Sequence, residues 1–309
     1  MKSAICTLFE GHYHFGVGVL VNSLYKNGFR GIVWAGYRGK LPPWAKPLRS
    51  CKEYKEFTIA EECIVRFIHL NTELHLTNYK ASFMIDILNR YQKEVESIFY
   101  FDPDIVIKCP WSFYEKWISY GVALCQDNCY YNMPSNHPLK MAWKEFADNL
   151  GYKASRQLEY YINAGFIGLK KEDLQILLIW KRLLNELQKE NINLIHLKAG
   201  RRNEKFHNPD QDMLNLTLML TEQSLSVIGP EGMDFKPAGY TMSHAASPPK
   251  PWRKNYILRA LNGEAPVLAD KEYWKNTQWP IKLFSEQKLY YKKISLLFAI
   301  AIGRFIKRR

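Results

Sequence analysis

Apolar residues along the first forty positions alternate between strand-like runs and a segment with helical spacing. The runs 4–9 and 31–36 are short, apolar and strand-prone, whereas residues 15–25 carry apolar side chains at helical spacing and are followed by Asn27-Gly28. A strand, a helix and a second strand in this order are typical of a parallel sheet with crossover helices. The beginning of the chain therefore predicts an α/β protein.

The same alternation continues through the middle of the chain and changes near residue 266. We predict further strands at 64–70, 97–101, 122–125 and 160–169, and helices at 79–95, 174–187 and 212–220. Beyond residue 265 the chain is aromatic and basic, with no strand pattern. We therefore expect an α/β domain, residues 1–265, in which helices flank a mixed, Rossmann-like sheet, followed by a basic helical tail, residues 266–309.

The net charge of +13 indicates an anionic partner, and much of it lies in the tail. Between residues 271 and 309, ten Lys or Arg stand against Glu272 and Glu286. With its aromatic and aliphatic residues, the tail fits a helix that lies on an anionic membrane surface, although a C-terminal helix packed on the domain is the alternative. We expect no nucleic-acid partner, because no nucleic-acid-binding motif accompanies the charge.

Cysteine usage and the apolar runs bear on where the protein works. The six cysteines form no C-x-x-C pair, which favours reduced thiols over a zinc site or a disulfide framework. The chain opens with a strand-like run instead of a signal-peptide pattern, and no run reaches the roughly 18 apolar residues that span a bilayer. We expect a cytoplasmic protein, peripheral at the inner face of a membrane.

Two acidic residues follow a strand of the buried type. The run 97–101 leads directly into Asp102-Pro103-Asp104. The carboxyl ends of strands in a parallel sheet open into the ligand crevice, and two carboxylates held close together there repel each other unless a cation neutralises them. Hard oxygen ligands suit Mg²⁺ or Mn²⁺, which also bind diphosphate oxygens. A solvated Asp-Pro turn that caps a following helix is the alternative.

A late loop with the sequence HAASPPKPW, residues 244–252, offers further polar groups. Its three prolines stiffen the loop and would fix the direction in which Lys250 points. His244 could complete a site with two aspartates while Lys250 meets a phosphate, but a surface His and a solvated Lys are the alternative. Two weaker motifs precede it. NAG at 163–165 has small residues that allow close approach, with a β-bulge as the alternative, and DQD at 210–212 has a helix cap as the alternative.

In the order DPD, NAG, DQD and HAASPPKPW, these motifs resemble glycosyltransferase family 8, the retaining galactosyltransferase- and glycogenin-like enzymes of the GT-A fold. The His-x₅-Lys-Pro-Trp block is the most specific of them, and together they span residues 102–252. The resemblance implies a metal-dependent hexosyltransferase. It would move a sugar from a nucleotide-diphosphate-sugar, a UDP-sugar by this likeness, to a glycan or lipid-linked acceptor with retention of configuration.

The resemblance also implies roles for single residues. Mn²⁺, or Mg²⁺, would be held by Asp102, Asp104 and His244, and the diphosphate would pair with Lys250. Ser247 stands where the family often has a glycine, and Asn78-Tyr79-Lys80 stands near the family's Tyr-Ala-Arg block, with Lys80 serving for the arginine. The donor sugar and reaction centre would be lined by Asn163, Asp210 and Gln211, the base or ribose by His12 and Tyr13 after the first strand, and the acceptor by Asp127.

Two other readings of the sequence remain open at this point. A metal-dependent nucleotidyltransferase would also need an acidic pair and a basic loop, but no Gly-rich phosphate loop follows the first strand. A non-enzymatic basic protein that binds membranes or nucleic acid would account for the charge alone. The products of the reaction separate the first alternative from glycosyl transfer, and a steep salt dependence of nucleic-acid binding would favour the second.

Overall fold

A nine-stranded mixed sheet forms the centre of the protein, whose computed structural model describes residues 2–130, 132–201, 204–237 and 239–306. The strand order is β10-β8-β9-β6-β1-β2-β5-β4-β3. The expected α/β architecture, a mixed sheet flanked by helices, is confirmed and is compatible with a Rossmann-like fold. The strands are β1 (Ser3–Glu10), β2 (Gly31–Arg38), β3 (Arg49–Ser50), β4 (Lys55–Ala60), β5 (Cys63–His69), β6 (Ser97–Phe101), β8 (Val122–Gln126), β9 (Ile162–Lys170) and β10 (Leu225–Ile228), and β7 (Ile105–Ile107) pairs separately with β11 (Met242–His244).

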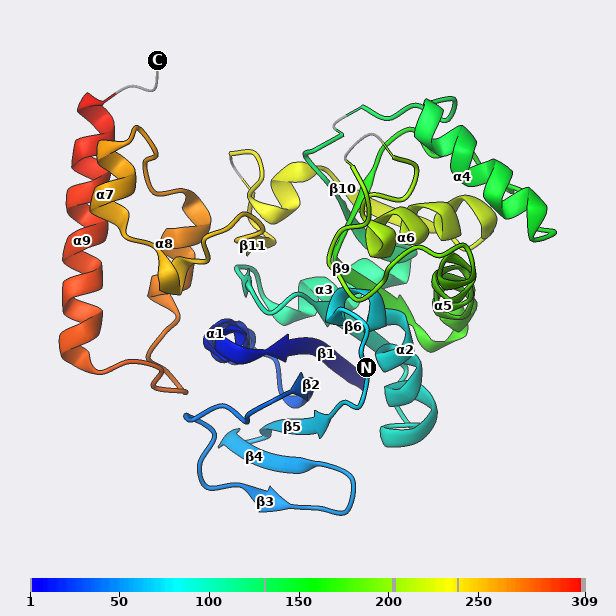
Figure 1. The fold of residues 1–309 in the computed structure, drawn as a ribbon. Helices are drawn as coiled ribbons and strands as arrows, with labels where there is room; N and C mark the ends of the chain where they lie inside the picture. Colours follow the sequence, from blue (N-terminus) through cyan, green and yellow to red (C-terminus); the bar gives the residue numbers. More distant parts are fainter. Residues whose placement is uncertain (1, 131, 202–203, 238, 307–309) are drawn as a thin grey trace.

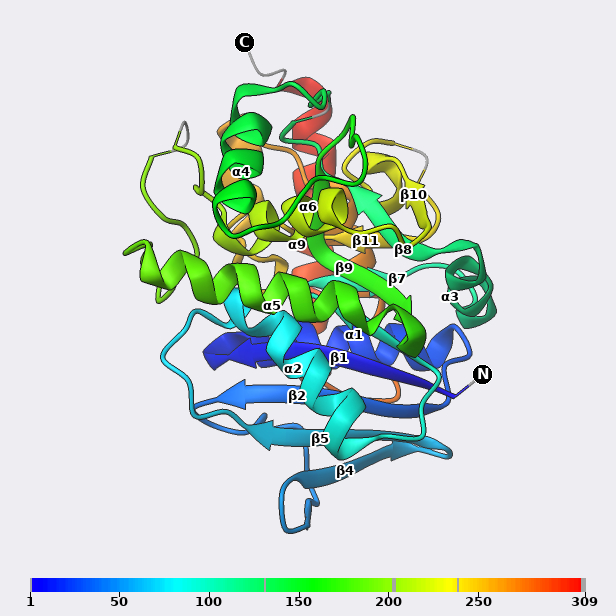
Figure 2. The same ribbon diagram turned by 90° about the vertical axis from the view of Figure 1, so that its right-hand side faces the viewer.

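Helices cover both faces of this sheet and enclose two hydrophobic clusters. One face carries α2, α4, α5 and α6, of which α2 and α5 lie in front of the sheet in Figure 2, and the other carries α1, α3, α7, α8 and α9. The helices are α1 (His14–Lys26), α2 (Lys80–Asp86), α3 (Trp111–Trp117), α4 (Pro138–Asn149), α5 (Leu174–Lys189), α6 (Pro209–Leu220), α7 (Tyr256–Leu261), α8 (Leu268–Lys275) and α9 (Glu286–Phe305).

The central strands are apolar on both sides because both faces of the sheet are covered. The first seven residues of β1 and all five residues of β6 are buried, which is the reason they read as continuous apolar runs instead of alternating ones. β1 pairs in parallel with β2 on one side and with β6 on the other. The strand-helix-strand opening predicted from the sequence is thereby confirmed, and the end of β6 lies near the middle of the sheet.

The predicted helix 79–95 is wrong in its length. α2 ends at Asp86 and is followed by a π-helical turn, Ile87–Tyr91, after which Gln92 leaves the helix. The indole N–H of Trp34 donates to Gln92 Oε1 at 2.6 Å. This contact with β2 fixes Gln92 outside the helix, although the apolar spacing of the sequence would let the helix continue. A local apolar pattern does not contain that long-range contact.

The C-terminal segment packs on the α1 face before it forms α9. The Asn22 amide donates to the carbonyls of Asn276 and Ile281 at 2.8 and 2.9 Å and accepts from Ile281 N–H at 2.7 Å. Trp274 and Phe284 belong to the hydrophobic cluster of that face. α9 lies along α7 at one edge of the molecule (Figure 1), while the last three cations of the predicted tail, Lys307, Arg308 and Arg309, lie outside the described residues.

Among the helices that the structure describes, none combines the length and apolarity needed to cross a bilayer. None of the six cysteines, all of which lie among the described residues, forms a disulfide.

Candidate metal centre

A short antiparallel ladder brings the two ends of the candidate site together. After β6 the chain turns, with Asp102 N–H donating to the Gly165 carbonyl at 2.7 Å and Ile105 N–H to the Asp102 carbonyl at 3.0 Å. β7 then pairs with β11 so that Ile105 lies opposite His244. Because β7 follows the D-P-D turn directly, the ladder sets His244 beside both aspartates. A strand, not a helix, follows this turn, so the helix-cap alternative does not apply.

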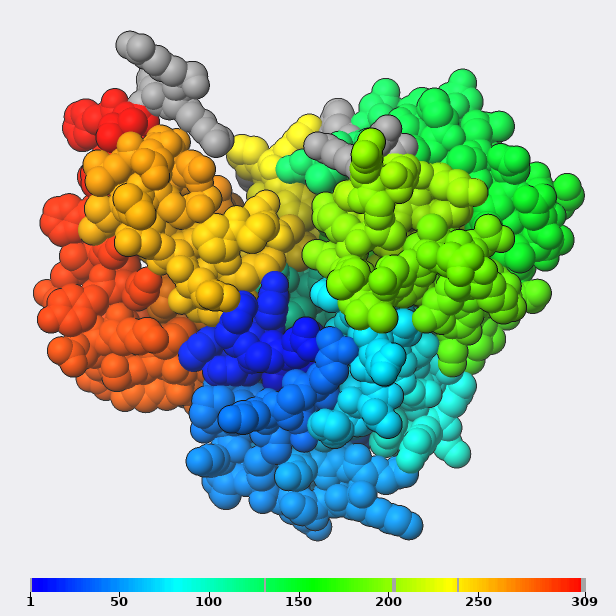
Figure 3. All heavy atoms as spheres, in the orientation of Figure 1, coloured from blue at the N-terminus to red at the C-terminus, as the bar shows by residue number. Residues whose placement is uncertain are grey.

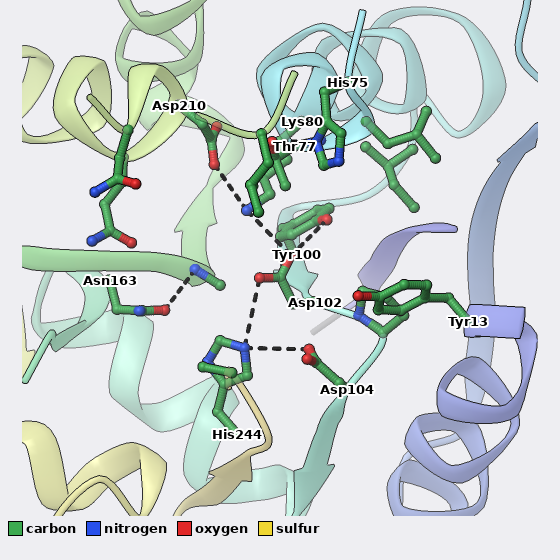
Figure 4. Close-up of a pocket in the computed structure, with 18 of the residues that line it drawn as sticks. Tyr13, His75, Thr77, Lys80, Tyr100, Asp102, Asp104, Asn163, Asp210 and His244 are labelled. Carbon is green, nitrogen blue, oxygen red and sulfur yellow. Dashed lines mark hydrogen bonds and ion pairs between the residues drawn. The ribbon is translucent and has the colours of Figure 1, made fainter. Parts of the chain in front are cut away.

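Asp102, Asp104 and His244 converge on one point. His244 Nε2 lies 3.2 Å from Asp104 Oδ1 and 3.7 Å from Asp102 Oδ2 (Figure 4). One ligand atom from each residue lies within 4.8 Å of the others, so the group could hold a metal ion. Two carboxylates and one imidazole suit a divalent ion such as Mn²⁺, and three protein ligands leave positions for substrate oxygens.

Gly165 leaves the space that these three side chains need. A Cβ atom at this position would lie 2.5 Å from His244 Cε1 and 2.9 Å from Asp102 Oδ2, closer than non-bonded atoms approach. Gly165 N–H also donates to Asn163 Oδ1 at 2.8 Å. Gly165 of the NAG motif therefore leaves room for the three candidate ligands.

Each aspartate presents one oxygen to His244 and the other to a buried lysine. Lys80 Nζ lies 3.2 Å from Asp102 Oδ1 and 2.9 Å from Asp210 Oδ2, and it donates to the Ala164 carbonyl at 2.8 Å. Lys250 Nζ bonds Asp104 Oδ2 and two carbonyls of its own loop. The lysines thereby fix both carboxylates and leave Asp102 Oδ2 and Asp104 Oδ1 directed at the candidate metal position.

The charges of this network follow from its contacts. Burial alone would raise the pKa of Asp104, but Lys250 and His244 outweigh burial and hold that pKa well below its ordinary value. Burial raises the pKa of Asp210 to about 7, although Lys80 opposes the shift. Burial likewise opposes the charge of Lys80, but Asp102 and Asp210 raise its pKa above the ordinary value. Asp104 is therefore a carboxylate and Lys80 a cation at neutral pH.

Asp127 joins the NAG and DQD motifs on the other side of the pocket. Its Oδ2 accepts from Asn163 Nδ2 at 2.6 Å and from Gln211 Nε2 at 3.2 Å, while Gln211 Oε1 accepts from Ala164 N–H at 3.0 Å. Asp210 presents its Oδ1 without a hydrogen-bond partner among the described residues, although that atom is buried. These groups form a polar wall that could position the hydroxyls of a ligand.

The candidate metal centre lies in a pocket of about 320 Å³. In Figure 3 the surface is hollowed where the blue N-terminal segment meets the yellow and green segments. Ten of the residues predicted from the sequence line the pocket, namely Tyr13, Lys80, Asp102, Asp104, Asp127, Asn163, Asp210, Gln211, His244 and Lys250.

His12 lies beside the pocket instead of lining it. Its ring accepts from the Trp252 indole N–H at 2.9 Å, lies 3.1 Å from Arg253 Nη1, and stacks on Tyr13 with ring centroids 4.9 Å apart. Its contacts therefore connect the K-P-W loop to Tyr13, which does face the pocket. Ser247 is likewise not among the lining residues, whereas its neighbour Ala246 is.

Several lining residues were not expected from the sequence. Tyr100 donates its hydroxyl hydrogen to Asp102 Oδ1 at 3.0 Å. Its position two residues before Asp102 is the sequence feature that could have predicted this contact. His75, Thr77 and Lys198 also line the pocket. His75 and Thr77 belong to the 3-10 turn before α2 and Lys198 to the loop before α6, and only the fold brings them to the site.

Comparison of the chain with protein-family models gave no match, and comparison with curated proteins also gave none.

Proposed function

We propose that this protein is a metal-dependent glycosyltransferase with a GT-A-type fold. It would transfer a hexose from a nucleotide-diphosphate-sugar, with UDP as the expected nucleotide, to a glycan or lipid-linked acceptor. The observation that carries the proposal is the convergence of Asp102, Asp104 and His244 in one pocket with Lys250. Candidate cation ligands and a candidate phosphate-binding lysine, from distant motifs, lie together there, and departure of a diphosphate would use both.

The leaving diphosphate is the charged centre of the proposed reaction. Asp102 Oδ2, Asp104 Oδ1 and His244 Nε2 would hold Mn²⁺ or Mg²⁺, which when bound supplies positive charge for the oxygens of the leaving group. Lys250 lies next to Asp104 and would add positive charge near the same oxygens, while its three N–H groups are bonded to Asp104 and to the Ala245 and Ala246 carbonyls. No side chain has to change its protonation state for this stabilisation, so the network can be fully organised before the bond breaks.

The polar wall fits the sugar and the reaction centre. Glycosyl transfer passes through an oxocarbenium-like state at the anomeric carbon. The unpaired Oδ1 of Asp210 is available to accept a sugar hydroxyl, and Gln211 and Asn163 are held in place by Asp127. Retention would place the attacking acceptor on the same face as the leaving group or use a covalent intermediate, and Asp210 and Gln211 are the candidates near that face.

The remaining parts of the proposal concern the base, the acceptor and location. Tyr13 lines the pocket with its ring and is positioned by His12 and Trp252, which suits contact with the base or ribose.

Exposed aromatic and aliphatic side chains on α9, namely Tyr290, Tyr291, Leu297, Phe298 and Phe305, suit attachment to the inner face of a membrane, where a lipid-linked acceptor would be found.

A thermal-shift screen of nucleotide-sugars with and without Mn²⁺ tests the proposal. Stabilisation by one nucleotide-diphosphate-sugar should be larger with Mn²⁺ than without it, because ligand and metal bind the folded protein together. Incubation with that donor should release nucleoside diphosphate. Release of pyrophosphate would indicate nucleotidyl transfer instead, and the absence of any metal-dependent shift would contradict the proposal.

A further inference from the structure

A second cavity lies between α9 and the turn that follows Lys250. It has a volume of about 580 Å³ and is lined by residues 253–255 and by side chains from the beginning of α9. The residues that matter for its chemistry are Arg253, Lys254, Lys288, Lys292 and Ser295. Four of the lining side chains are cations and none is a carboxylate.

Among the described residues, three of these cations have no acidic partner. Lys254 Nζ is paired with the buried carboxylate of Asp270, at 2.8 and 3.0 Å. In the part of the chain that the structure describes, no ion pair includes Arg253, Lys288 or Lys292. The cavity therefore concentrates positive charge that the protein itself does not neutralise.

The positions of the two α9 lysines increase this imbalance. Lys288 and Lys292 are four residues apart on one helix face, where like charges repel. Lys292 is half-buried and donates to the Lys254 carbonyl at 2.9 Å, and burial followed by the charge of Lys288 lowers its pKa. Lys288 lies over the rings of Phe284 and Phe15, which hold it in place without neutralising it. An anion between the two amines would relieve both effects.

We propose that this cavity binds a phosphate group through Arg253, Lys288 and Lys292. A tetrahedral phosphate offers several oxygens to donors that approach from different sides, which suits one guanidinium and two ammonium groups. The beginning of α9 lies at the same cavity, and its positive end favours an anion. The phosphate can belong to the headgroup of an anionic phospholipid or to a soluble phosphate, and the inference does not depend on glycosyl transfer.

The phospholipid source agrees with the surroundings of the cavity. Tyr291 lines it and is 62% exposed, and Leu297 and Phe298 extend the exposed apolar surface along the same helix. Arg253 also reaches His12 beside the metal-centre pocket. A headgroup bound here would hold the opening of that pocket near the membrane surface.

Binding measurements on the full-length protein test the site directly. Isothermal titration with inorganic phosphate should show saturable binding, and the Lys288→Gln/Lys292→Gln variant should weaken it at least about tenfold, because two charge-assisted contacts are lost. The matched control is Lys52→Gln/Lys55→Gln, which removes the same charge from exposed positions around β4, at the lower edge in Figure 1. The control should bind phosphate as the wild type does.

Vesicle sedimentation separates the two sources of phosphate. Tighter binding to vesicles with phosphatidylglycerol than to pure phosphatidylcholine, with competition by free phosphate, would identify the headgroup as the ligand. Saturable phosphate binding without that preference would support the site with soluble phosphate as its ligand. Equal losses in both double variants, or no measurable phosphate binding together with unchanged vesicle binding by Lys288→Gln/Lys292→Gln, would overturn the proposal.

Discussion

His244 Nε2 lies 3.2 Å from Asp104 Oδ1, and the contact is made by the two-stranded β7–β11 ladder and not by the main sheet. Val106 and Ser243, the central pair of that ladder, are both buried. The end of β6 sets the position of Asp102 and Asp104. The short β7–β11 ladder sets the position of the His244 imidazole. The metal centre should consequently depend on both sheets, and each ligand can be tested separately.

Asp102→Asn should abolish metal-dependent donor hydrolysis and transfer. The amide keeps an oxygen for Tyr100 and Lys80 but removes the charge that Asp102 Oδ2 offers to a cation, so Mn²⁺ affinity should fall by about 100-fold or more. Calorimetric Mn²⁺ titration and release of nucleoside diphosphate measure the two effects. Asp148→Asn, whose carboxylate is half exposed and pairs with Lys153, is the control. Full activity of Asp102→Asn would remove the metal assignment.

Gly165→Ala should weaken the metal centre, because the new Cβ would lie 2.5 Å from His244 Cε1. Gly168→Ala on the same strand is a matched control, since its Cβ would meet the Phe99 ring at a similar 2.5 Å but away from the ligands. Both variants should unfold at lower temperature. Only Gly165→Ala should lose Mn²⁺ affinity, and an equal affinity in the two variants would show that Gly165 is needed for packing alone.

Lys80→Met should destabilise the protein by roughly 3 kcal/mol, because it leaves the buried carboxyl of Asp210 and the partly exposed carboxylate of Asp102 without their shared ammonium. Lys170→Met removes an exposed partner of Glu172 and should cost less than about 1 kcal/mol. Urea unfolding in metal-free buffer measures both changes. If the two variants lose the same stability, the buried network does not require Lys80.

The D-P-D and K-P-W motifs could be predicted as site segments because the residues that indicate their chemistry are neighbours in the sequence. Asp102 and Asp104 follow a run whose five residues are all buried, and burial on both faces produces an apolar run that sequence inspection detects. By contrast, β7 and β11 have three residues each and β3 has two, which is too short for any periodicity. The convergence of His244 with the aspartates could be expected from the motifs, but the ladder that produces it could not.

The sequence also could not predict residues whose contacts are with distant parts of the chain. His12 lies at the end of β1 as expected, yet its ring is engaged by Trp252 and Arg253, a pairing that no local pattern contains. The same holds for Gln92, whose contact with Trp34 ends the helix predicted to reach residue 95. Local patterns indicate which residues can do chemistry, and tertiary contacts decide which of them face the pocket.

Titration of Asp212 should lower the stability of the protein as the pH rises toward 7. Burial raises the pKa of Asp212 to about 7, and its carboxylate accepts from the Tyr161 hydroxyl at 2.5 Å and from Asn208 N–H at 2.9 Å, both neutral donors. The folded protein therefore keeps a proton on Asp212 that the unfolded chain releases near its ordinary pKa of about 3.9. Between these values the folded state binds more protons, so the free energy of unfolding falls with rising pH, by on the order of 4 kcal/mol in total.

Thermal unfolding of the wild type and of Asp212→Asn across this pH range measures the effect. As the pH falls below about 7, the melting temperature of the wild type should rise relative to that of Asp212→Asn. Above the raised pKa of Asp212, the difference between the two melting temperatures should be constant. Asp210 also has a raised pKa and is present in both proteins, so only its interaction with Asp212 remains in the difference. Parallel curves over the whole range would show that Asp212 does not hold a proton in the folded state.

Attachment to a membrane should depend on the exposed apolar side of α9. Leu297 and Phe298 are 65% and 59% exposed, and their loss should reduce partitioning into vesicles by about tenfold or more, since apolar burial contributes about 25 cal/mol per Å². Deleting the chain beyond residue 270 would be a poor test, because Trp274 and Phe284 lie in the core. The better comparison is Leu297→Gln/Phe298→Gln against Leu258→Gln/Leu261→Gln, which changes equally exposed residues of α7. Vesicle flotation should separate the two double variants, and equal flotation would place any membrane contact elsewhere than on α9.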